Sequence, residues 1–250
     1  DLNEQQFAAV TAPPGPALVI AGAGSGKTRT LTYRVAYLLD NGIYASNILL
    51  LTFTNKAARE MLERVEQLVP HDTQDLWGGT FHSVGNKILR RHADELGFNR
   101  NFSIMDREDQ KELIVSAIAD AKIDTKELKF PKPEIVADVF SLVVNMEMSI
   151  EDLLEWKYPY FEHFKDELFE VHEKYELKKI NTNSMDFDDL LVKTYQLLTE
   201  NPDLCKYYQK QFEWVLVDEY QDTNSVQSKM IDILAAPQNN IMVVGDDAQS

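Results

Sequence analysis

The residues AGAGSGKT (21–28) are the most informative segment of this 250-residue chain. They follow a short apolar run, ALVIA at 17–21, and precede a stretch with helical spacing that extends from Lys27 to Leu39. A strand, a glycine-rich turn and a helix in this order predict a phosphate loop, because the glycines let successive backbone N–H groups point inward at a phosphate. Ala21 stands where the usual pattern has its first glycine. A glycine-rich turn with an incidental lysine is the alternative interpretation.

The side chains of this segment add the chemistry of a nucleotide site. Lys27 supplies a charge for the β- and γ-phosphates, and Thr28 offers its hydroxyl to Mg²⁺. We therefore predict that the whole segment binds a nucleotide together with Mg²⁺, through Ala21, Gly22, Ala23, Gly24, Ser25, Gly26, Lys27 and Thr28.

An acidic segment, VDEYQD (217–222), follows the apolar run at 214–216. Open parallel sheets place their ligands at the carboxyl ends of the strands, so this acidic pair is expected to face the phosphate loop. Asp218 is predicted to hold Mg²⁺, and Glu219 to orient and deprotonate the attacking water. Taken alone, an Asp-Glu pair would more often begin a surface helix. Its pairing with a phosphate loop favours the catalytic interpretation.

The last segment, VGDDAQS (244–250), repeats this arrangement of a strand end followed by polar side chains. Gln249 is the candidate there for contacting the γ-phosphate or the attacking water, although alone it would be an ordinary loop residue. The catalytic set predicted from the sequence is therefore Lys27, Asp218, Glu219 and Gln249.

Three zones along the chain predict an α/β fold with an insertion. Residues 1–85 alternate short apolar runs with helical stretches, a pattern typical of a parallel sheet buried on both faces. Residues 86–200 have helical spacing, with capped starts at Asp106 and Ser149. Residues 201–250 return to strands, so the predicted architecture is one α/β domain, split into 1–85 and 201–250 and interrupted by an all-helical subdomain. The apolar runs expected to be strands are 17–21, 47–53, 75–81, 214–218 and 240–245.

The composition limits the classes of protein that remain. With 44% hydrophobic and 26% charged residues, the chain is typical of a soluble globular protein, and no apolar run approaches the about 18 residues of a membrane span. Its single cysteine, Cys205, excludes a disulfide framework and a cysteine-rich zinc site, and fits a reducing, cytoplasmic compartment. The net charge of −16 comes from residues 101–250, because residues 1–100 carry ten acidic and ten basic side chains. This balance argues against a nonspecific polyanion binder, yet a local groove can still hold a few phosphates.

Six segments in a fixed order resemble the superfamily 1 DNA helicases of the UvrD/Rep/PcrA family. They are AGAGSGKTRT, LTFTNKAAREM, TFHS, MDFDDLL, VDEYQDTN and VGDDAQS. Alanine at the first phosphate-loop position is also what this family has, so the departure noted above supports the resemblance. The similarity extends over essentially the whole chain, from LNEQQ (2–6) to Ser250.

The resemblance implies an ATP-dependent DNA helicase that moves 3′→5′ along DNA, with ATP and Mg²⁺ as cofactors and with roles in DNA repair and DNA replication. The α/β domain is then expected to be a RecA-like ATPase domain, and the chain to be the N-terminal, ATP- and DNA-binding half of the motor. Single-stranded DNA and single-strand/duplex junctions are the expected partners, together with a second RecA-like domain of the same parent chain. No membrane partner is expected.

That second domain would supply arginines to the γ-phosphate. We therefore expect this chain alone to bind Mg-nucleotide weakly, to hydrolyse it poorly and not to unwind DNA.

The resemblance also assigns residues outside the phosphate loop. Gln6 is similar to the glutamine that reads adenine in this family, and Arg29 to the arginine that packs on the adenine; alone, Gln6 would be a solvated residue at a helix start. The expected DNA contacts are Thr52, Phe53, Thr54, Asn55, Phe81 and His82. The hydroxyls and the Asn55 amide would donate to phosphates, and Phe53 would stack on a base. Phe53 fits a core position equally well, and a lone histidine such as His82 is more often a structural hydrogen-bonding residue.

Three aspartates in MDFDDLL resemble a metal-binding cluster, but their spacing does not support one. Asp186, Asp188 and Asp189 lack the later glycine and glutamate of a calcium loop. Carboxylates in the first turn of a helix interact favourably with the helix dipole, so helix capping is the better prediction.

Rival functions also fit parts of the sequence. A phosphate-loop NTPase of another kind, such as a small-molecule kinase, would leave LTFTNKAAREM and TFHS without a role. A nucleotide-gated binding module that does not unwind DNA would not need an intact Lys27, Asp218 and Glu219. Among helicases, a member of a recombination complex that also carries a nuclease domain fits these residues as well.

Overall fold

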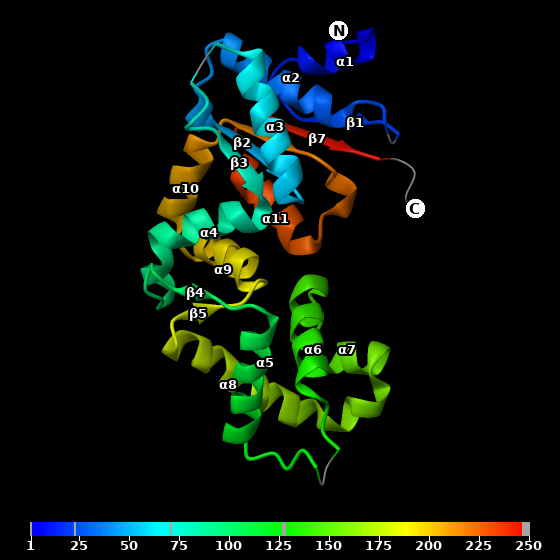
Figure 1. The fold of residues 1–250 in the computed structure, drawn as a ribbon, viewed down its shortest axis with the longest axis vertical. Coiled ribbons are helices and arrows are strands. Elements are labelled where there is room, and N and C mark those ends of the chain that lie inside the picture. Colours follow the sequence, from blue (N-terminus) through cyan, green and yellow to red (C-terminus); the bar gives the residue numbers. More distant parts are fainter. Residues whose placement is uncertain (1, 23, 71, 127–128, 247–250) are drawn as a thin grey trace. The chain divides into compact units, whose positions relative to one another are not determined.

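The computed structural model describes residues 2–22, 24–70, 72–126 and 129–246. Their contacts divide the chain into two compact units (Figure 1). The sheet unit consists of Asp1–Gly85, Leu198–Thr223 and Gln227–Ser250, and the helical unit of Asn86–Leu197 and Asn224–Val226. In the sequence, most of the helical unit therefore lies between the first and second parts of the sheet unit.

A parallel sheet, with five strands in the described residues, forms the centre of the sheet unit. The strands are β1 (Ala17–Ile20), β2 (Ile48–Thr52), β3 (Trp77–Thr80), β6 (Trp214–Val217) and β7 (Ile241–Gly245). Their spatial order is β1-β7-β6-β2-β3, and each neighbouring pair runs parallel. Each strand lies within one of the apolar runs of the sequence, so the predicted α/β fold with a parallel sheet is confirmed.

The central strands β2 and β6 explain the continuous apolar runs. All of their residues are buried, which is the pattern of a parallel strand covered on both faces. Leu51 of β2 is paired with Val217 of β6, and Val217 with Val243 of β7. The carboxyl ends of these three strands consequently lie at one edge of the sheet, where polar side chains that follow each strand can meet.

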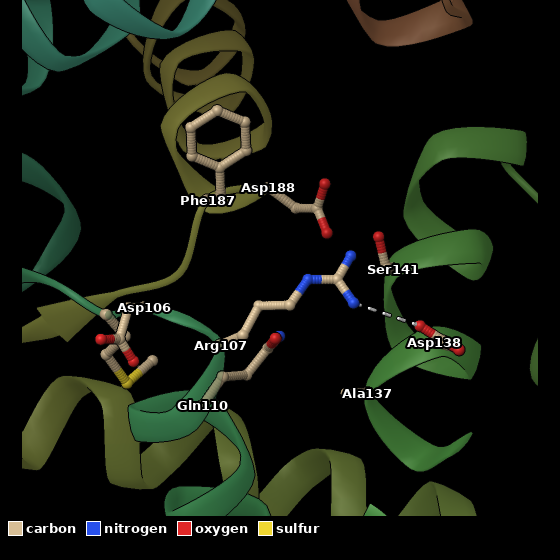
Figure 2. A pocket seen from close by; sticks show the side chains of 9 residues that line it. Asp106, Arg107, Gln110, Ala137, Asp138, Ser141, Phe187 and Asp188 are labelled. Carbon is tan, nitrogen blue, oxygen red and sulfur yellow. Dashed lines mark ion pairs between the residues drawn. The ribbon is translucent and has the colours of Figure 1, made fainter. Parts of the chain in front are cut away.

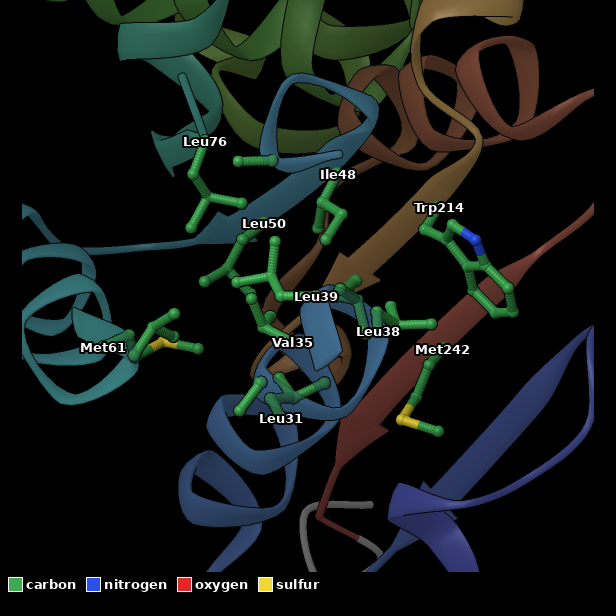
Figure 3. Packing of buried hydrophobic residues seen from close by; sticks show 14 of the residues in the cluster. Leu31, Val35, Leu38, Leu39, Ile48, Leu50, Met61, Leu76, Trp214 and Met242 are labelled. Carbon is green, nitrogen blue, oxygen red and sulfur yellow. The ribbon is translucent and has the colours of Figure 1, made fainter. Parts of the chain in front are cut away.

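Helices α2 (Lys27–Asp40) and α3 (Asn55–Leu68) supply much of the apolar core against this sheet. In Figure 3, Leu31 and Val35 of α2 lie with Met61 of α3, Leu50 of β2 and Met242 of β7. Further helices of this part of the chain are α1 (Glu4–Val10), α10 (Pro202–Gln211) and α11 (Ser225–Ala235), with the 3₁₀ helices η1 (Ala45–Asn47) and η4 (Tyr220–Asp222). Helix α4 (Phe81–His92) begins in the sheet unit and ends in the helical unit.

The helical unit is built mainly from α5 (Arg107–Asp120), α6 (Pro133–Met146), α7 (Ile150–Lys157), α8 (Lys165–Asn181) and α9 (Asp189–Glu200), with the 3₁₀ helices η2 (Ala93–Leu96) and η3 (Pro159–Phe164). Both predicted helix starts are present. Asp106 forms a capping box with Asp109, and the Ser149 side chain accepts a hydrogen bond from the Asp152 N–H. In the described part of the chain, no helix combines the length and the apolar character that crossing a bilayer requires.

Two short strands pair in the helical unit, where the sequence predicted helices only. They are β4 (Ser103–Ile104) and β5 (Ser184–Met185), and they run parallel. The Ser103 N–H donates to the Asn183 carbonyl at 2.9 Å, and the Met105 N–H to the Met185 carbonyl at 2.8 Å. Two residues are too few for an alternation of apolar and polar side chains, so the sequence carries no periodic signal for these strands.

Candidate nucleotide-binding site

The phosphate loop connects the carboxyl end of β1 to the start of α2. Gly24 and Gly26 have φ angles of 77° and 84°, a left-handed conformation that glycine adopts without the steric cost of a β-carbon. A β-carbon on Gly26 would also lie 2.7 Å from the side-chain nitrogen of Gln6. The Ala21 N–H donates at 3.1 Å to the carbonyl of the last residue of β7, which ties the loop to the sheet. The other predicted loop residues are Gly22 and Ser25, both exposed, and Ala23, which lies outside the described residues.

Lys27 occupies an acidic environment in the first turn of α2. Its side chain is only 7% exposed, and Nζ lies 2.6 Å from Asp246 Oδ1 and 3.8 Å from Glu219 Oε2. A buried ammonium group needs such partners, because an unpaired buried charge is strongly destabilising. A bound phosphate would compete with these two carboxylates for the same positive charge.

Thr28 and Asp218 bring two oxygen donors together beside the loop. Thr28 Oγ1 donates a hydrogen bond to Asp218 Oδ2 at 3.0 Å. Burial raises the pKa of the Asp218 carboxyl, the hydrogen bond from Thr28 lowers it, and the Glu219 carboxylate raises it again. A divalent cation would relieve the cost of burying this charge, and Mg²⁺ prefers oxygen ligands of these types. The residues present therefore fit a Mg²⁺ ion.

Glu219 turns the chain sharply at the end of β6. Its φ of 51° and ψ of 45° are left-handed, which costs a non-glycine residue about 1–2 kcal/mol. Its N–H donates to Asp218 Oδ1 at 3.0 Å. The side chain is 37% exposed and lies near Lys27, so water can reach the carboxylate beside the phosphate loop. Gln249, the fourth member of the predicted catalytic set, lies outside the described residues.

Two residues of this site, Asp246 and Gln221, were not predicted from the sequence. Asp246 follows β7 and contacts Lys27, and the strand-end rule that selected Asp218 applies to it as well. Gln221 Nε2 donates to Glu219 Oε2 at 2.6 Å, and Gln221 Oε1 accepts from the Asp246 N–H at 3.1 Å. No local sequence pattern marks this glutamine, because its two partners follow different strands.

Gln6 and Arg29, the residues expected to hold the adenine, both lie next to the phosphate loop. Gln6 Nε2 donates to the Ser25 carbonyl at 3.0 Å, so its amide is engaged by the loop itself. Arg29 is exposed, with its guanidinium carbon 5.5 Å from the ring centroid of Tyr33. Arg29, Tyr33 and Arg64 line a pocket of about 260 Å³ on the surface of α2 and α3.

Four of the expected DNA contacts retain exposed surface. Thr54 and Asn55 are exposed at the start of α3, where Thr54 Oγ1 accepts a hydrogen bond from the Ala57 N–H at 3.1 Å. Phe53 and His82 are half-buried. These four side chains follow the carboxyl ends of β2 and β3, at the same edge of the sheet as the phosphate loop.

Thr52 and Phe81, the other two expected DNA contacts, are buried. They are 2% and 1% exposed, so the structure does not offer these two side chains to a DNA strand. Thr52 is the last residue of a strand that is buried along its whole length. Phe81 packs on Phe53 with the ring centroids 5.3 Å apart, and so supports the more exposed ring.

The aspartates of MDFDDLL lie at the start of α9 in the helical unit. The Asp189 N–H donates to Asp186 Oδ1 at 2.8 Å, and the Asp186 N–H donates to Asp189 Oδ2 at 2.9 Å, as expected for helix capping. Lys179, which is 2% exposed, bonds to both carboxylates at 3.3 and 2.8 Å. Among the residues that the structure describes, no group of three or more potential ligands could hold a metal ion.

The helical unit also contains a pocket of about 470 Å³, lined by residues of α5 and α6 and of the turn before α9 (Figure 2). Arg107 Nη1 lies 3.9 Å from Asp138 Oδ1 there. Phe187, which is 58% exposed, lines the same pocket. This pocket could not be predicted from the sequence, because its residues come from three separate segments.

The chain is similar to known proteins along its whole length. The UvrD/REP helicase N-terminal domain family matches residues 2–250. The chain is 40% identical over 250 residues to an ATP-dependent DNA helicase PcrA of Staphylococcus aureus, an alignment that covers 100% of this chain and 33% of that relative. It is 41% identical over 251 residues to an ATP-dependent DNA helicase PcrA of Staphylococcus epidermidis, covering 100% of this chain and 34% of that relative. The chain thus spans about a third of the length of these curated relatives. Because the family match covers nearly every residue, the chain belongs to the UvrD/REP helicase N-terminal domain family.

Proposed function

We propose that this chain is the ATP-binding and single-stranded-DNA-binding first motor half of an ATP-dependent DNA helicase. The observation that carries the proposal is the convergence of Lys27, Thr28, Asp218 and Glu219 at one edge of the sheet, with contacts of 3.0 to 3.8 Å linking them. Family membership supports the same reaction, since the similar proteins are named as ATP-dependent DNA helicases.

The proposed site divides the work of hydrolysis among its residues. The N–H groups of the phosphate loop and the Lys27 ammonium bind the β- and γ-phosphates of ATP. Thr28 and Asp218 hold Mg²⁺, which supplies positive charge to the phosphate oxygens when it is bound. Glu219 orients the attacking water and accepts its proton, with Gln249 as a second contact to the γ-phosphate or the water. Gln6 and Arg29 hold the adenine.

Single-stranded DNA is proposed to cross the ends of β2 and β3. Thr54 and Asn55 would donate to phosphates, Phe53 would stack on a base, and the half-buried His82 is the remaining candidate. The buried Thr52 and Phe81 would then hold this surface from beneath rather than touch the strand. Movement would be 3′→5′, with single-strand/duplex junctions as the point of unwinding.

A second RecA-like domain of the same protein is proposed to close over the γ-phosphate. Arginines supplied in this way are worth about 10³–10⁵ in rate in other phosphate-loop enzymes. The chain alone should therefore bind Mg-nucleotide weakly, hydrolyse it slowly and not unwind DNA. DNA as a partner and a buried free thiol, Cys205, favour a cytoplasmic location.

Nucleotide binding by the 250-residue chain tests the ATP site directly. In a fluorescence titration with a labelled ATP analogue, Lys27→Ala should weaken binding by about tenfold or more, because one charge-assisted contact contributes about 1.5–3 kcal/mol. Removing Mg²⁺ should weaken binding by the unsubstituted chain as well. The matched control is Lys56→Ala, since the Lys56 side chain is 87% exposed on α3 and lies outside the proposed site. Equal affinities for the Lys27 and Lys56 variants would refute the proposed site.

A further inference from the structure

We propose that Gln221 is a positioning residue for ATP hydrolysis, which orients the Glu219 carboxylate and links it to the backbone that follows β7. The inference rests on the proposed function, because it takes Glu219 to be the group that acts on the attacking water. Gln221 itself reaches the reaction only through Glu219.

The amide of Gln221 uses both of its ends. Nε2 donates to Glu219 Oε2 at 2.6 Å, the shortest contact of that carboxylate in the described part of the chain. Oε1 accepts at 3.1 Å from the Asp246 N–H, the first backbone donor after β7. One neutral side chain on η4 therefore bridges the residues that follow two neighbouring strands, β6 and β7.

Gly245 makes room for this bridge at the end of β7. A β-carbon on Gly245 would lie 2.8 Å from Gln221 Oε1, closer than such atoms approach in proteins. Gly245 is not among the glycines with positive φ, so its backbone does not require glycine. The absence of a side chain at this position is explained by the space that the Gln221 amide occupies.

Glu219 needs an orienting partner because its carboxylate is partly exposed. Its side chain is 37% exposed, and Lys27 Nζ lies 3.8 Å from Oε2. When the Lys27 ammonium contacts a phosphate instead, the Gln221 amide remains as a donor to Glu219 Oε2. The other carboxylate oxygen, Glu219 Oε1, is then left to face the water. An error of about 1 Å in the placement of a reacting group can cost about 10²-fold in rate, so this single hydrogen bond can control hydrolysis.

The second end of the bridge connects Glu219 to the segment VGDDAQS. A displacement of the backbone at Asp246 would move the Gln221 amide, and the amide would move the Glu219 carboxylate. The proposed γ-phosphate contact, Gln249, lies three residues further along the same segment. Gln221 would therefore make the orientation of the base depend on the position of this segment.

The test measures two quantities in the full-length natural protein that contains this chain: kcat for ATP hydrolysis and Kd for a labelled ATP analogue. Gln221→Met keeps the length of the side chain and removes both hydrogen bonds. It should lower kcat by about 10- to 100-fold while Kd changes by less than about threefold. Gln221→Glu should lower kcat further, because it places a second carboxylate against Glu219.

Gly245→Ala should displace the Gln221 amide while residue 221 itself stays glutamine. The new methyl group displaces Gln221 Oε1, so kcat should fall as in Gln221→Met. Substitutions that act through one contact are not additive. The double variant Gly245→Ala/Gln221→Met should therefore be no slower than the slower single variant.

Gln209→Met is the matched control, because its Nε2 donates to the Ile233 carbonyl at 2.8 Å and not to a site residue. It should leave kcat within about twofold. A kcat within about twofold for Gln221→Met would overturn the inference. An increase in the Kd of Gln221→Met as large as its loss of kcat would also overturn the inference. So would a melting temperature of Gln221→Met that is lowered more than that of Gln209→Met. If Glu219→Gln does not slow hydrolysis, both the proposed function and this inference fail. If Glu219→Gln abolishes hydrolysis but Gln221→Met leaves kcat unchanged, only the inference fails.

Discussion

The buried carboxylate of Asp218 is well placed to bind a cation, but it destabilises the fold when no cation is bound. The side chain is 2% exposed, and burial raises the pKa of its carboxyl. Three neighbouring groups offset part of this cost: the Thr28 hydroxyl and the Glu219 N–H, which both donate to the carboxylate, and the positive charge of Lys27. Stability and function therefore make opposite demands on this position.

Asp218→Asn should raise the stability of the nucleotide-free chain at pH 7, because it removes a buried charge. The folded-state pKa of Asp218 lies above the unfolded value of about 3.9, so the native state binds the proton more tightly. Protonation of Asp218 therefore stabilises the folded state. This contribution to the free energy of unfolding is complete below about pH 4 and is lost as the pH rises through the folded-state pKa. Melting temperatures of both chains, recorded across this range without Mg²⁺, should converge at low pH and separate above it. A pH-independent difference, or a less stable variant at pH 7, would contradict this.

Individual residues were predictable where a local pattern specifies their chemistry. Lys27, Thr28 and the pair at 218–219 follow strand ends, and parallel strands bring such ends together. Gln221 was not predictable in this way, because its role depends on a contact with Asp246, which follows a different strand. The burial of Thr52 and Phe81 likewise follows from packing, which the motif letters do not encode.

Among the elements, the start of α9 is held to α8 by a buried network of charges. Lys179 on α8 contacts Glu176, Asp186 and Asp189 at 2.7, 3.3 and 2.8 Å. Burial alone would lower the pKa of Lys179, but the carboxylates of Asp189, Asp186 and Glu176 raise it by more, so the side chain stays charged. The capped start of α9 therefore depends on a lysine that lies seven residues before Asp186.

Lys179→Met should lower the free energy of unfolding by about 3–5 kcal/mol, because it removes the buried cation that Asp186 and Asp189 share. The neighbouring Lys178→Met is the control, since Lys178 pairs with the exposed Asp120 and such a pair contributes at most about 1 kcal/mol. Urea unfolding followed by circular dichroism compares the two. Similar losses for the two variants would show that the buried network does not stabilise the helical unit.

Elements with a clear apolar pattern were the predictable ones. The run at 47–53 contains β2 and the run at 214–218 contains β6, since central parallel strands are apolar throughout. The capping pattern at Asp106 located the start of α5 for an equally local reason. The strands β4 and β5 were missed because two-residue strands are defined by pairing with a distant segment.

Across the whole molecule, the sheet unit is assembled from Asp1–Gly85 and from two segments after Leu197, and most of the helical unit comes from Asn86–Leu197. The candidate site depends on this arrangement, because the phosphate loop precedes residues 86–197 in the chain and the proposed catalytic pair at 218–219 follows them. The parallel register sets their carboxyl ends side by side. The domain boundaries at 85 and 200 stay predictions, as do the activities that need the rest of a protein about three times as long.

ATP hydrolysis by the full-length natural protein, with and without single-stranded DNA, tests the helicase proposal most directly. The proposal predicts that DNA strongly stimulates hydrolysis and that Lys27→Ala abolishes the stimulated rate, because the phosphate loop and the DNA-contacting residues belong to one motor. Hydrolysis that is indifferent to DNA would contradict it. The residues at the ends of β2 and β3 would then have another role, and a phosphate-loop NTPase of a different kind would be the better explanation.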